Sequence, residues 1–199
     1  MKQLQKLLEQ FKSLNPRDPG SWPPVPQAAL LISLLVGIVF LFVYLPVMEH
    51  VPTARNCWAP EAFYDADNKK FLICWATTIP GKFPKTDGQT RRNENDLGYD
   101  HRMYYVTTPD FETLSKAKLF YDQGFNVIDA TLIQDGRRYA MILKDETDRP
   151  HKPEKNLRVA FADKASGPYG PPSAPITGNY WAEGPTAIKL GSKWHVYFD

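Results

Sequence analysis

A pattern of acidic residue, strand, turn and strand recurs along this chain, and it restricts the fold more than any other feature. Asp129 of "VIDATLIQDGRRYAMIL" is matched 54 residues later by Glu183 of "AEGPTAIKLGSKWHVYF". Met103 of "MYYVTTPDF" is matched by Leu157 of "LRVAFADK" at the same spacing. Repeats of about 50 residues with several short strands are typical of β-propellers. A generic meander of hairpins is the alternative, and the matched acids argue against it.

A third copy begins at "WAPEAFYDADNKKFLICW", where Glu61 takes the acidic place, and a polar insertion at about 80–100 follows it. Alternating residues predict strands, with "DADNKK", "QDGRR" and "LGSK" as turns before three of them. The predicted strands are 69–76, 102–108, 138–145, 157–163 and 193–199. We therefore expect residues 48–199 to form an all-β, incomplete β-propeller.

A long apolar stretch precedes this β-rich part. No charged residue lies between Pro19 and Met48, and fourteen of the 20 residues at 28–47 are Leu, Ile, Val or Phe. Twenty residues span a bilayer core, and each of these side chains favours insertion by roughly 0.3 to 0.6 kcal/mol. A cleaved signal peptide is disfavoured, because the apolar core is too long and no A-x-A site follows. We predict a transmembrane helix at 28–47, after a cytoplasmic amphipathic helix and Pro-rich linker at 1–27.

Positive charges flank the predicted span unevenly. Lys6, Lys12 and Arg17 precede it, whereas only Arg55 follows closely. Positive flanks stay in the cytoplasm, so we expect a single-pass protein of the bacterial inner membrane with its C-terminal domain in the periplasm. Residues 1–45, with "LNPRDPGSWP" before the apolar run, resemble the N-terminal anchor of PilO, an inner-membrane protein of the type IV pilus alignment complex. The resemblance implies pilus-assembly partners for this segment.

The composition disfavours several classes of function. The net charge is only +2 and both signs are mixed along the chain, so we expect no nucleic-acid partner. The sequence has no H-E-x-x-H motif, paired C-x-x-C motif or Gly-rich phosphate loop, so we expect no metal and no cofactor. The two cysteines, Cys57 and Cys74, either pair in an oxidising compartment or remain buried thiols.

Acids that open successive propeller blades would point into one central funnel, where they suit glycoside hydrolysis. That reaction needs one carboxylic acid to protonate the leaving oxygen and one carboxylate to activate water or attack, and a further carboxylate raises the pKa of the acid. The segments "WAPEAFYD", "NVIDATLIQDG", "AEGPTAIKLG" and "WHVYFD" resemble glycoside hydrolase family 43, five-bladed propeller arabinofuranosidases and xylosidases. The resemblance covers residues 46–199 and implies about two and a half of five blades. It also implies inverting hydrolysis of arabinose- or xylose-containing glycans.

The resemblance to family 43 also implies roles for individual residues. Glu183 would be the general acid, and Asp129 would tune the pKa of that acid and orient it. The general base belongs to a first blade upstream of "WAPE", where this sequence has its apolar stretch. We therefore expect the general base to be absent and the chain to be inactive alone, which leaves its status as an enzyme open.

Other residues have both a functional and a structural interpretation. Trp58 and Trp181 would stack on sugar rings or pack in the core, and Glu61 would bind substrate or support the funnel wall. The pair 101–102 is expected to be a solvated strand end, and the run 144–146 is expected to be a charged strand end. A pilus-assembly scaffold and a membrane-tethered carbohydrate-binding module remain alternative functions.

The charge asymmetry predicts the topology of the chain. Alkaline phosphatase fused after Asp199 should be active in cells, because that enzyme needs the periplasm, and a cytoplasmic reporter at the same position should be silent. The opposite pair of results would contradict the orientation.

Overall fold

The computed structural model describes residues 46–86, 98–147, 155–178 and 180–199, all within the compact unit 46–199. The predicted amphipathic helix and all but two residues of the predicted transmembrane helix lie outside these residues. Pro46 and Val47, the last two residues of the predicted span, lie in a loop and a turn. Within the described ranges, no helix has the length and apolar character needed to cross a membrane.

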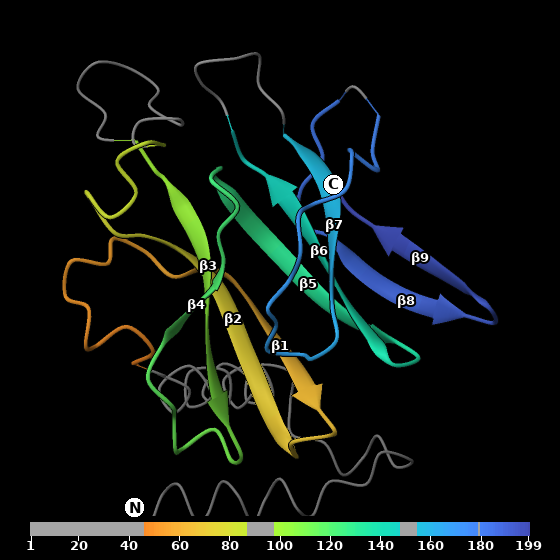
Figure 1. The fold of residues 1–199 in the computed structure, drawn as a ribbon, viewed down its shortest axis with the longest axis horizontal. Coiled ribbons are helices and arrows are strands. Elements are labelled where there is room, and N and C mark those ends of the chain that lie inside the picture. The colour runs from red at the N-terminus through yellow and green to blue at the C-terminus, as the bar shows by residue number, and fades with distance from the viewer. Residues whose placement is uncertain (1–45, 87–97, 148–154, 179) are drawn as a thin grey trace, which may run out of the picture. The chain divides into compact units, whose positions relative to one another are not determined.

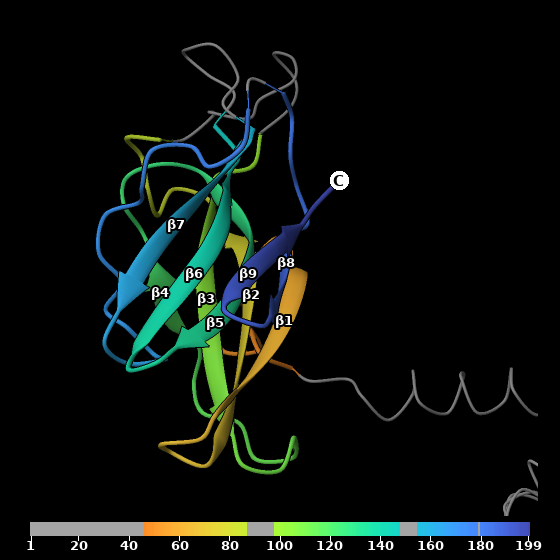
Figure 2. The same cartoon turned by 90° about the vertical axis from the view of Figure 1, so that its right-hand side faces the viewer.

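The described part of the chain is all-β, as predicted. It forms three antiparallel sheets with the strand orders β1-β2-β3-β4, β5-β6-β7 and β8-β9. Figure 1 shows the three sheets following one another across the molecule, and Figure 2 shows the β8–β9 hairpin from the side that lies at the right of Figure 1. The strands are β1 Trp58–Asp65, β2 Lys70–Thr78, β3 His101–Thr108, β4 Lys118–Tyr121, β5 Val127–Asp135, β6 Arg138–Asp145, β7 Asn156–Ala162, β8 Thr186–Leu190 and β9 Lys193–Tyr197.

The five strands predicted from alternation are present as β2, β3, β6, β7 and β9, with ends shifted by at most two residues. The predicted turns close three hairpins, β1–β2, β5–β6 and β8–β9. Met103 and Leu157, matched in the repeat, lie on β3 and β7, the third strand of each larger sheet. Alternation does not reveal β4, because its four residues are too few to show a period.

A proline-rich segment runs beside β7 in the place of a fourth strand. The backbone N–H groups of Gly170, Ser173 and Ile176 donate to carbonyl groups of β7 at 2.8 to 2.9 Å. Pro171, Pro172 and Pro175 have no N–H to donate, so a regular ladder cannot form there. The second sheet therefore follows the four-stranded pattern of the first, with an irregular segment in place of its outer strand.

The first strands of the three sheets, β1, β5 and β8, are neighbours, and we call them the inner strands. β1, β5 and β8 run in a similar direction in Figure 1, and β5 contacts both β1 and β8. This arrangement of successive antiparallel sheets is consistent with a partial propeller.

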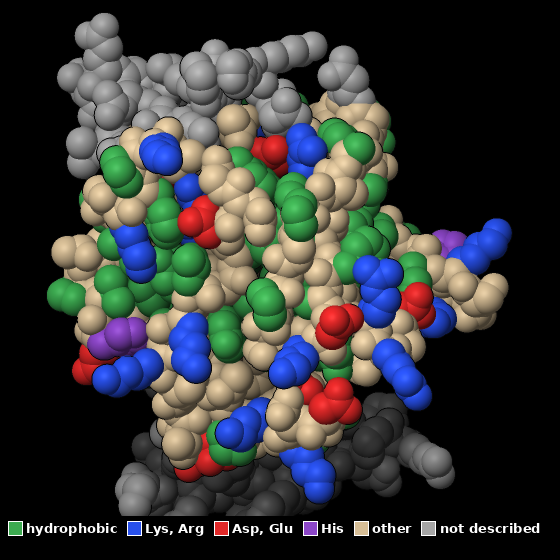
Figure 3. Space-filling view, viewed as in Figure 1, with side chains coloured by type: hydrophobic (Ala, Val, Ile, Leu, Met, Phe, Trp, Pro, Cys, Tyr) green, Lys and Arg blue, Asp and Glu red, His purple; other side chains and the backbone are tan. Residues whose placement is uncertain are grey.

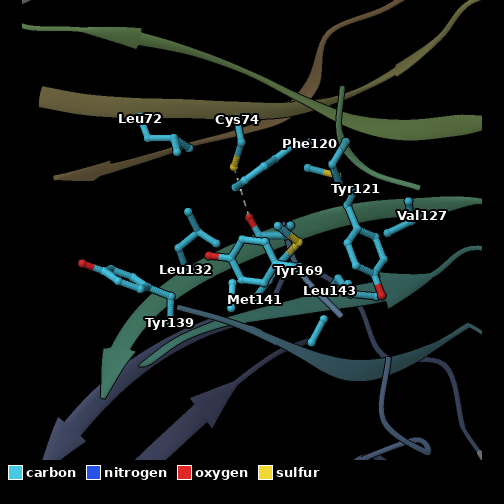
Figure 4. Packing of buried hydrophobic residues seen from close by; sticks show 14 of the residues in the cluster. Leu72, Cys74, Phe120, Tyr121, Val127, Leu132, Tyr139, Met141, Leu143 and Tyr169 are labelled. Carbon is cyan, nitrogen blue, oxygen red and sulfur yellow. Dashed lines mark hydrogen bonds between the residues drawn. The ribbon is translucent and has the colours of Figure 1, made fainter. Parts of the chain in front are cut away.

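The core lies between the first two sheets. Leu72, Cys74 and Met103 of the first sheet face Met141 and Leu143 of the second, and Figure 4 shows these two layers meeting. Both cysteines are free thiols; Cys74 is fully buried in this core and Cys57 is exposed.

The prediction that residues 101–102 form a solvated strand end is wrong. Arg102 is only 1% exposed. Its guanidinium forms ion pairs with Asp100 at 2.7 Å and Asp122 at 2.6 Å, and it lies 4.4 Å from the centre of the Phe83 ring. Two carboxylates and a ring compensate the burial of this charge, which alternation along the sequence cannot reveal.

Leu143→Ala tests whether the interface between the two sheets is the core. Leu143 is fully buried, so the variant should lose about 2 to 5 kcal/mol of unfolding free energy, measured by urea denaturation. Leu190→Ala removes the same atoms from an exposed position on β8 and should change stability by less than about 0.5 kcal/mol. Similar losses in both variants would contradict this location of the core.

Candidate active site

A left-handed residue marks the entry of each inner strand. Two of the three residues lie in β-bulges, which re-aim side chains. These residues are Ala59 before Glu61 of β1, Asp129 before Thr131 of β5 and Gly184 before Thr186 of β8, with φ angles of 48°, 51° and 57°. In each case regular strand pairing begins or resumes two residues later.

This backbone correspondence corrects the expected repeat of acids. The counterpart of Asp129 is Ala59 in the first sheet and Gly184 in the third. Glu61 therefore corresponds to Thr131, and Glu183 corresponds to Ile128, one residue before Asp129. Those two residues meet across the inner strands, where Thr131 Oγ1 donates a hydrogen bond to Glu61 Oε1 at 2.8 Å. Glu61 therefore does not open the first copy as Asp129 opens the second.

The structure brings Asp129 and Glu183 together. The backbone N–H of Gly184, the residue after Glu183, donates to Asp129 Oδ2 at 3.3 Å. Burial raises the pKa of the Asp129 carboxyl, and the nearby charges of Glu183 and Glu146 raise it further. The Gly184 N–H and Lys144 act in the opposite direction without cancelling the effect. Two carboxyl groups from neighbouring sheets thus share one site.

Lys144 lies between these sheets. The run 144–146 stands at the end of β6, as predicted, but Lys144 and Asp145 are buried. The Lys144 side chain is 6% exposed, and its ammonium contacts the carboxylates of Glu183 and, at 2.8 Å, Glu146. Burial alone would lower the pKa of Lys144, but the two carboxylates outweigh burial and raise it. The register pairs Lys144 with Ile128, the residue before Asp129, so strand pairing itself places the ammonium beside the acids.

A second lysine extends the charge network. Lys155 forms an ion pair with Glu146, and its ammonium lies 5.7 Å from the centre of the Trp181 ring. Burial would raise the pKa of Glu146, but the two lysines outweigh burial and lower it. Trp181 is 70% exposed, so its ring is free to meet a ligand beside this network.

Trp58 lies in an aromatic cluster at the start of β1. Its ring centre is 4.6 Å from that of Tyr99 and 5.2 Å from that of His101, and the side chain remains 44% exposed. His101 is only 2% exposed, and its Nδ1 lies 3.2 Å from Asn126 Oδ1. Burial lowers the pKa of His101 to about 4, so the ring is neutral near pH 7.

The predicted site residues therefore fall into three groups. Asp129 and Glu183 meet, Trp181 joins them through Lys155 and Glu146, and Trp58 and Glu61 lie on the first sheet without a direct contact to either acid among the described residues. A cleft of about 330 Å³ in the first sheet, lined by Asp65, Lys70, Tyr105 and Lys118 among others, contains none of the predicted residues.

The sequence analysis did not identify Lys144, Glu146, Lys155 and His101 as part of the site. The strand register beside Asp129 is the signal that could have found Lys144.

Comparison with known proteins identifies the family of this chain. A family model described as a probable glycosyl hydrolase domain, related to glycosyl hydrolase family 43, matches residues 44–199. The chain belongs to this family. An α-L-arabinofuranosidase of Bifidobacterium longum subsp. longum is 25% identical to it over 97 residues, which make up 49% of this chain and 9% of that enzyme.

Solved structures of glycoside hydrolases resemble this family member in fold. A family 117 glycoside hydrolase of the marine bacterium Zobellia galactanivorans has a TM-score of 0.53 at 16% identity, over 73% of this chain and 48% of that one. A family 43 β-xylosidase/α-arabinofuranosidase from a compost microbial metagenome, solved with xylotriose, has a TM-score of 0.49 at 16% identity, over 69% and 41%. The chain thus spans less than half the length of these relatives.

The raised pKa of Asp129 predicts a pH-dependent stability. In the unfolded chain the Asp129 carboxyl loses its proton near pH 3.9, whereas in the folded protein it keeps the proton to a higher pH. Between these two pKa values the folded state binds more protons, so unfolding free energy falls as pH rises. Asp129→Asn removes this loss. The stability of the variant relative to wild type should therefore increase between about pH 3.5 and pH 7, measured by urea denaturation.

Asp135→Asn is a matched control with the opposite sign. Its hydrogen bond with Lys189 lowers the pKa of Asp135, so this ion pair adds stability only once the carboxyl is ionised. The stability of this variant relative to wild type should therefore decrease as the pH rises towards about pH 4, and it should stay level from about pH 5 to pH 7. A parallel change in the two variants would contradict the burial of Asp129.

Proposed function

We propose that this protein is a membrane-anchored part of a glycoside hydrolase that acts on arabinose- or xylose-containing glycans by inverting hydrolysis. The observation that carries the proposal is the position of Asp129 beside Glu183: its carboxylate accepts a hydrogen bond from the backbone N–H of Gly184, the residue after Glu183. The membership in a family of probable glycosyl hydrolase domains supports the reaction class. The name of the Bifidobacterium relative supports an arabinofuranoside as the substrate.

Each residue has one task in the proposed reaction. Glu183 donates a proton to the glycosidic oxygen as the bond to the anomeric carbon breaks, and the leaving sugar departs as an alcohol. Water attacks the anomeric carbon from the opposite face and gives its proton to a base. Asp129 orients Glu183 through its hydrogen bond with the Gly184 backbone, and the Asp129 carboxyl lies beside the general acid. Trp181 and Trp58 offer ring faces to the sugar, and Glu61 supports the wall between the first two sheets.

The base has no assigned residue within residues 46–199. In family 43 the expected base lies on a blade before "WAPE", so we propose that another blade must supply it. Anchoring by residues 28–47 would hold the domain at the periplasmic face of the inner membrane, and residues 1–45 would meet pilus-assembly partners if the PilO resemblance holds.

A carbohydrate-binding module is the second candidate. The exposed rings of Trp58 and Trp181 favour it, because aromatic faces bind sugars without any chemistry. The contact of Lys144 with Glu183 also favours it, because that carboxylate already has a cationic partner.

The missing base predicts that residues 46–199 release no measurable nitrophenol from aryl arabinofuranosides or aryl xylosides. General acid and general base contributions are each worth roughly 10²- to 10⁴-fold, and a displacement of about 1 Å costs about 10²-fold more. Adding the first blade and the C-terminal blades of a related enzyme should restore turnover, measured as nitrophenol absorbance.

The control for this experiment is Glu183→Gln in the completed protein, which should abolish the restored turnover. Rapid hydrolysis by residues 46–199 alone would contradict the absence of a base, and Glu61 would then be the first residue to replace. Sugar binding without turnover in the completed protein would favour the binding module.

A further inference from the structure

Glu183 has little to hold it besides one lysine. It lies in the loop before β8, and its side chain is 54% exposed. Its backbone N–H and carbonyl pair with Asp199 at 2.9 and 3.1 Å, which fixes the main chain but not the carboxylate. Among the described residues, the ion pair with Lys144 is the side-chain contact that orients the carboxylate.

Lys144 is much better fixed than its partner. It belongs to β6 in the middle of the second sheet, and its side chain is almost fully buried. The charged groups around it come from several elements: Asp129 on β5, Glu146 after β6, Lys155 before β7 and Glu183 before β8. The nearby His101 is neutral near pH 7. Negative groups therefore outnumber positive ones around the ammonium.

We propose that Lys144 is the positioning residue of the general acid, and that Glu146 keeps its ammonium in place while Glu183 gains and loses its proton. This inference rests on the proposed function for the role of Glu183. It assigns Lys144 and Glu146 to the reaction although neither carries out a chemical step.

The need for two carboxylates follows from the burial of the ammonium. A general acid must be protonated before it reacts, and a protonated Glu183 no longer compensates the charge of Lys144. A buried ammonium without a partner is costly, so a lysine with a single carboxylate would move away or lose its proton. Glu146, 2.8 Å away and itself held by Lys155, removes this cost.

The same arrangement helps the proton leave. As Glu183 gives its proton to the glycosidic oxygen, negative charge develops on the carboxylate beside a fixed ammonium. A preorganised cation at that position stabilises the charge without reorganising at the moment of reaction. Lys144 therefore holds Glu183 in place before the step and stabilises its charge after it.

The first test is the reactivity of Lys144 in the full chain. Acetic anhydride labels free amines, and peptide mass spectrometry gives the rate for each lysine as a function of pH. Glu183→Gln removes one of two carboxylates and should lower the pKa of Lys144, so labelling at pH 9 should rise roughly three- to tenfold. The rate of Lys155, which contacts Glu146 and not Glu183, should stay unchanged in the same sample. Asp135→Asn is the matched control and should leave Lys144 unchanged.

The second test follows the Glu183 carboxyl directly. In the full chain with ¹³C-carboxyl glutamate, the Glu183 signal is the one lost in Glu183→Gln. At pH 7, Lys144→Met should shift this signal, and Lys144→Arg should bring it back towards wild type because the charge is restored. The ¹³C signal of an exposed acid elsewhere, Glu49, should not move.

An unchanged Lys144 profile in Glu183→Gln would overturn the inference, and so would an unmoved Glu183 signal in a folded Lys144→Met variant. If Lys144→Met does not fold, the labelling result alone decides. Neither readout needs hydrolysis. An inactive completed protein that shows both effects would therefore refute the proposed function alone, and an active one without them would refute this inference alone.

Discussion

The packing of the second sheet against the first is the constraint on which the rest of the structure depends. β5 lies at this interface, and Asp129, near the start of this strand, has a left-handed backbone conformation. The Sγ of Cys74, fully buried in the first sheet, lies 4.0 Å from the carbonyl oxygen of Ala130, the residue after Asp129. Close-packed interiors transmit small displacements rather than absorb them. The position of the Asp129 carboxyl is thus set by apolar residues that have no chemical role.

The candidate site adds a mixed set of charges to this apolar frame. Lys144 and Lys155 are buried, and each contacts Glu146. A buried ion pair is weak evidence for stability, because desolvation costs about as much as the attraction returns. The network is better explained as a means of fixing carboxylate positions. On the face shown in Figure 3, by contrast, acidic and basic side chains are interspersed without a large area of one sign, in keeping with a net charge of +2.

Sequence patterns predicted this molecule well where one strand decides the outcome. Alternation located β6 from Arg138 to Asp145, and short motifs singled out Asp129 and Glu183, which the fold brings together. The patterns failed where a second sheet decides. In the sequence Lys144 is only part of a charged strand end, and the loop before β8 is what brings Glu183 to it. β1 and β5 carry the same one-residue bulge, and it puts Ala59, two residues before Glu61, in the position that Asp129 takes in β5. A fixed repeat length cannot express that offset.

The third sheet shows why polar contacts matter so much at this site. The β8–β9 hairpin exposes Ile188 and Leu190, so few of its apolar residues hold it against the second sheet. Polar links join the two instead: Gly184 N–H to Asp129, Lys144 to Glu183, and Lys189 to Asp135 at 2.7 Å. The last link is exposed and of the kind that contributes little. The first two are the contacts that form the candidate site. The interactions that position Glu183 are therefore also those that attach the β8–β9 hairpin to the second sheet. A change in the position of the hairpin would change the geometry of the two acids, and the reverse also holds.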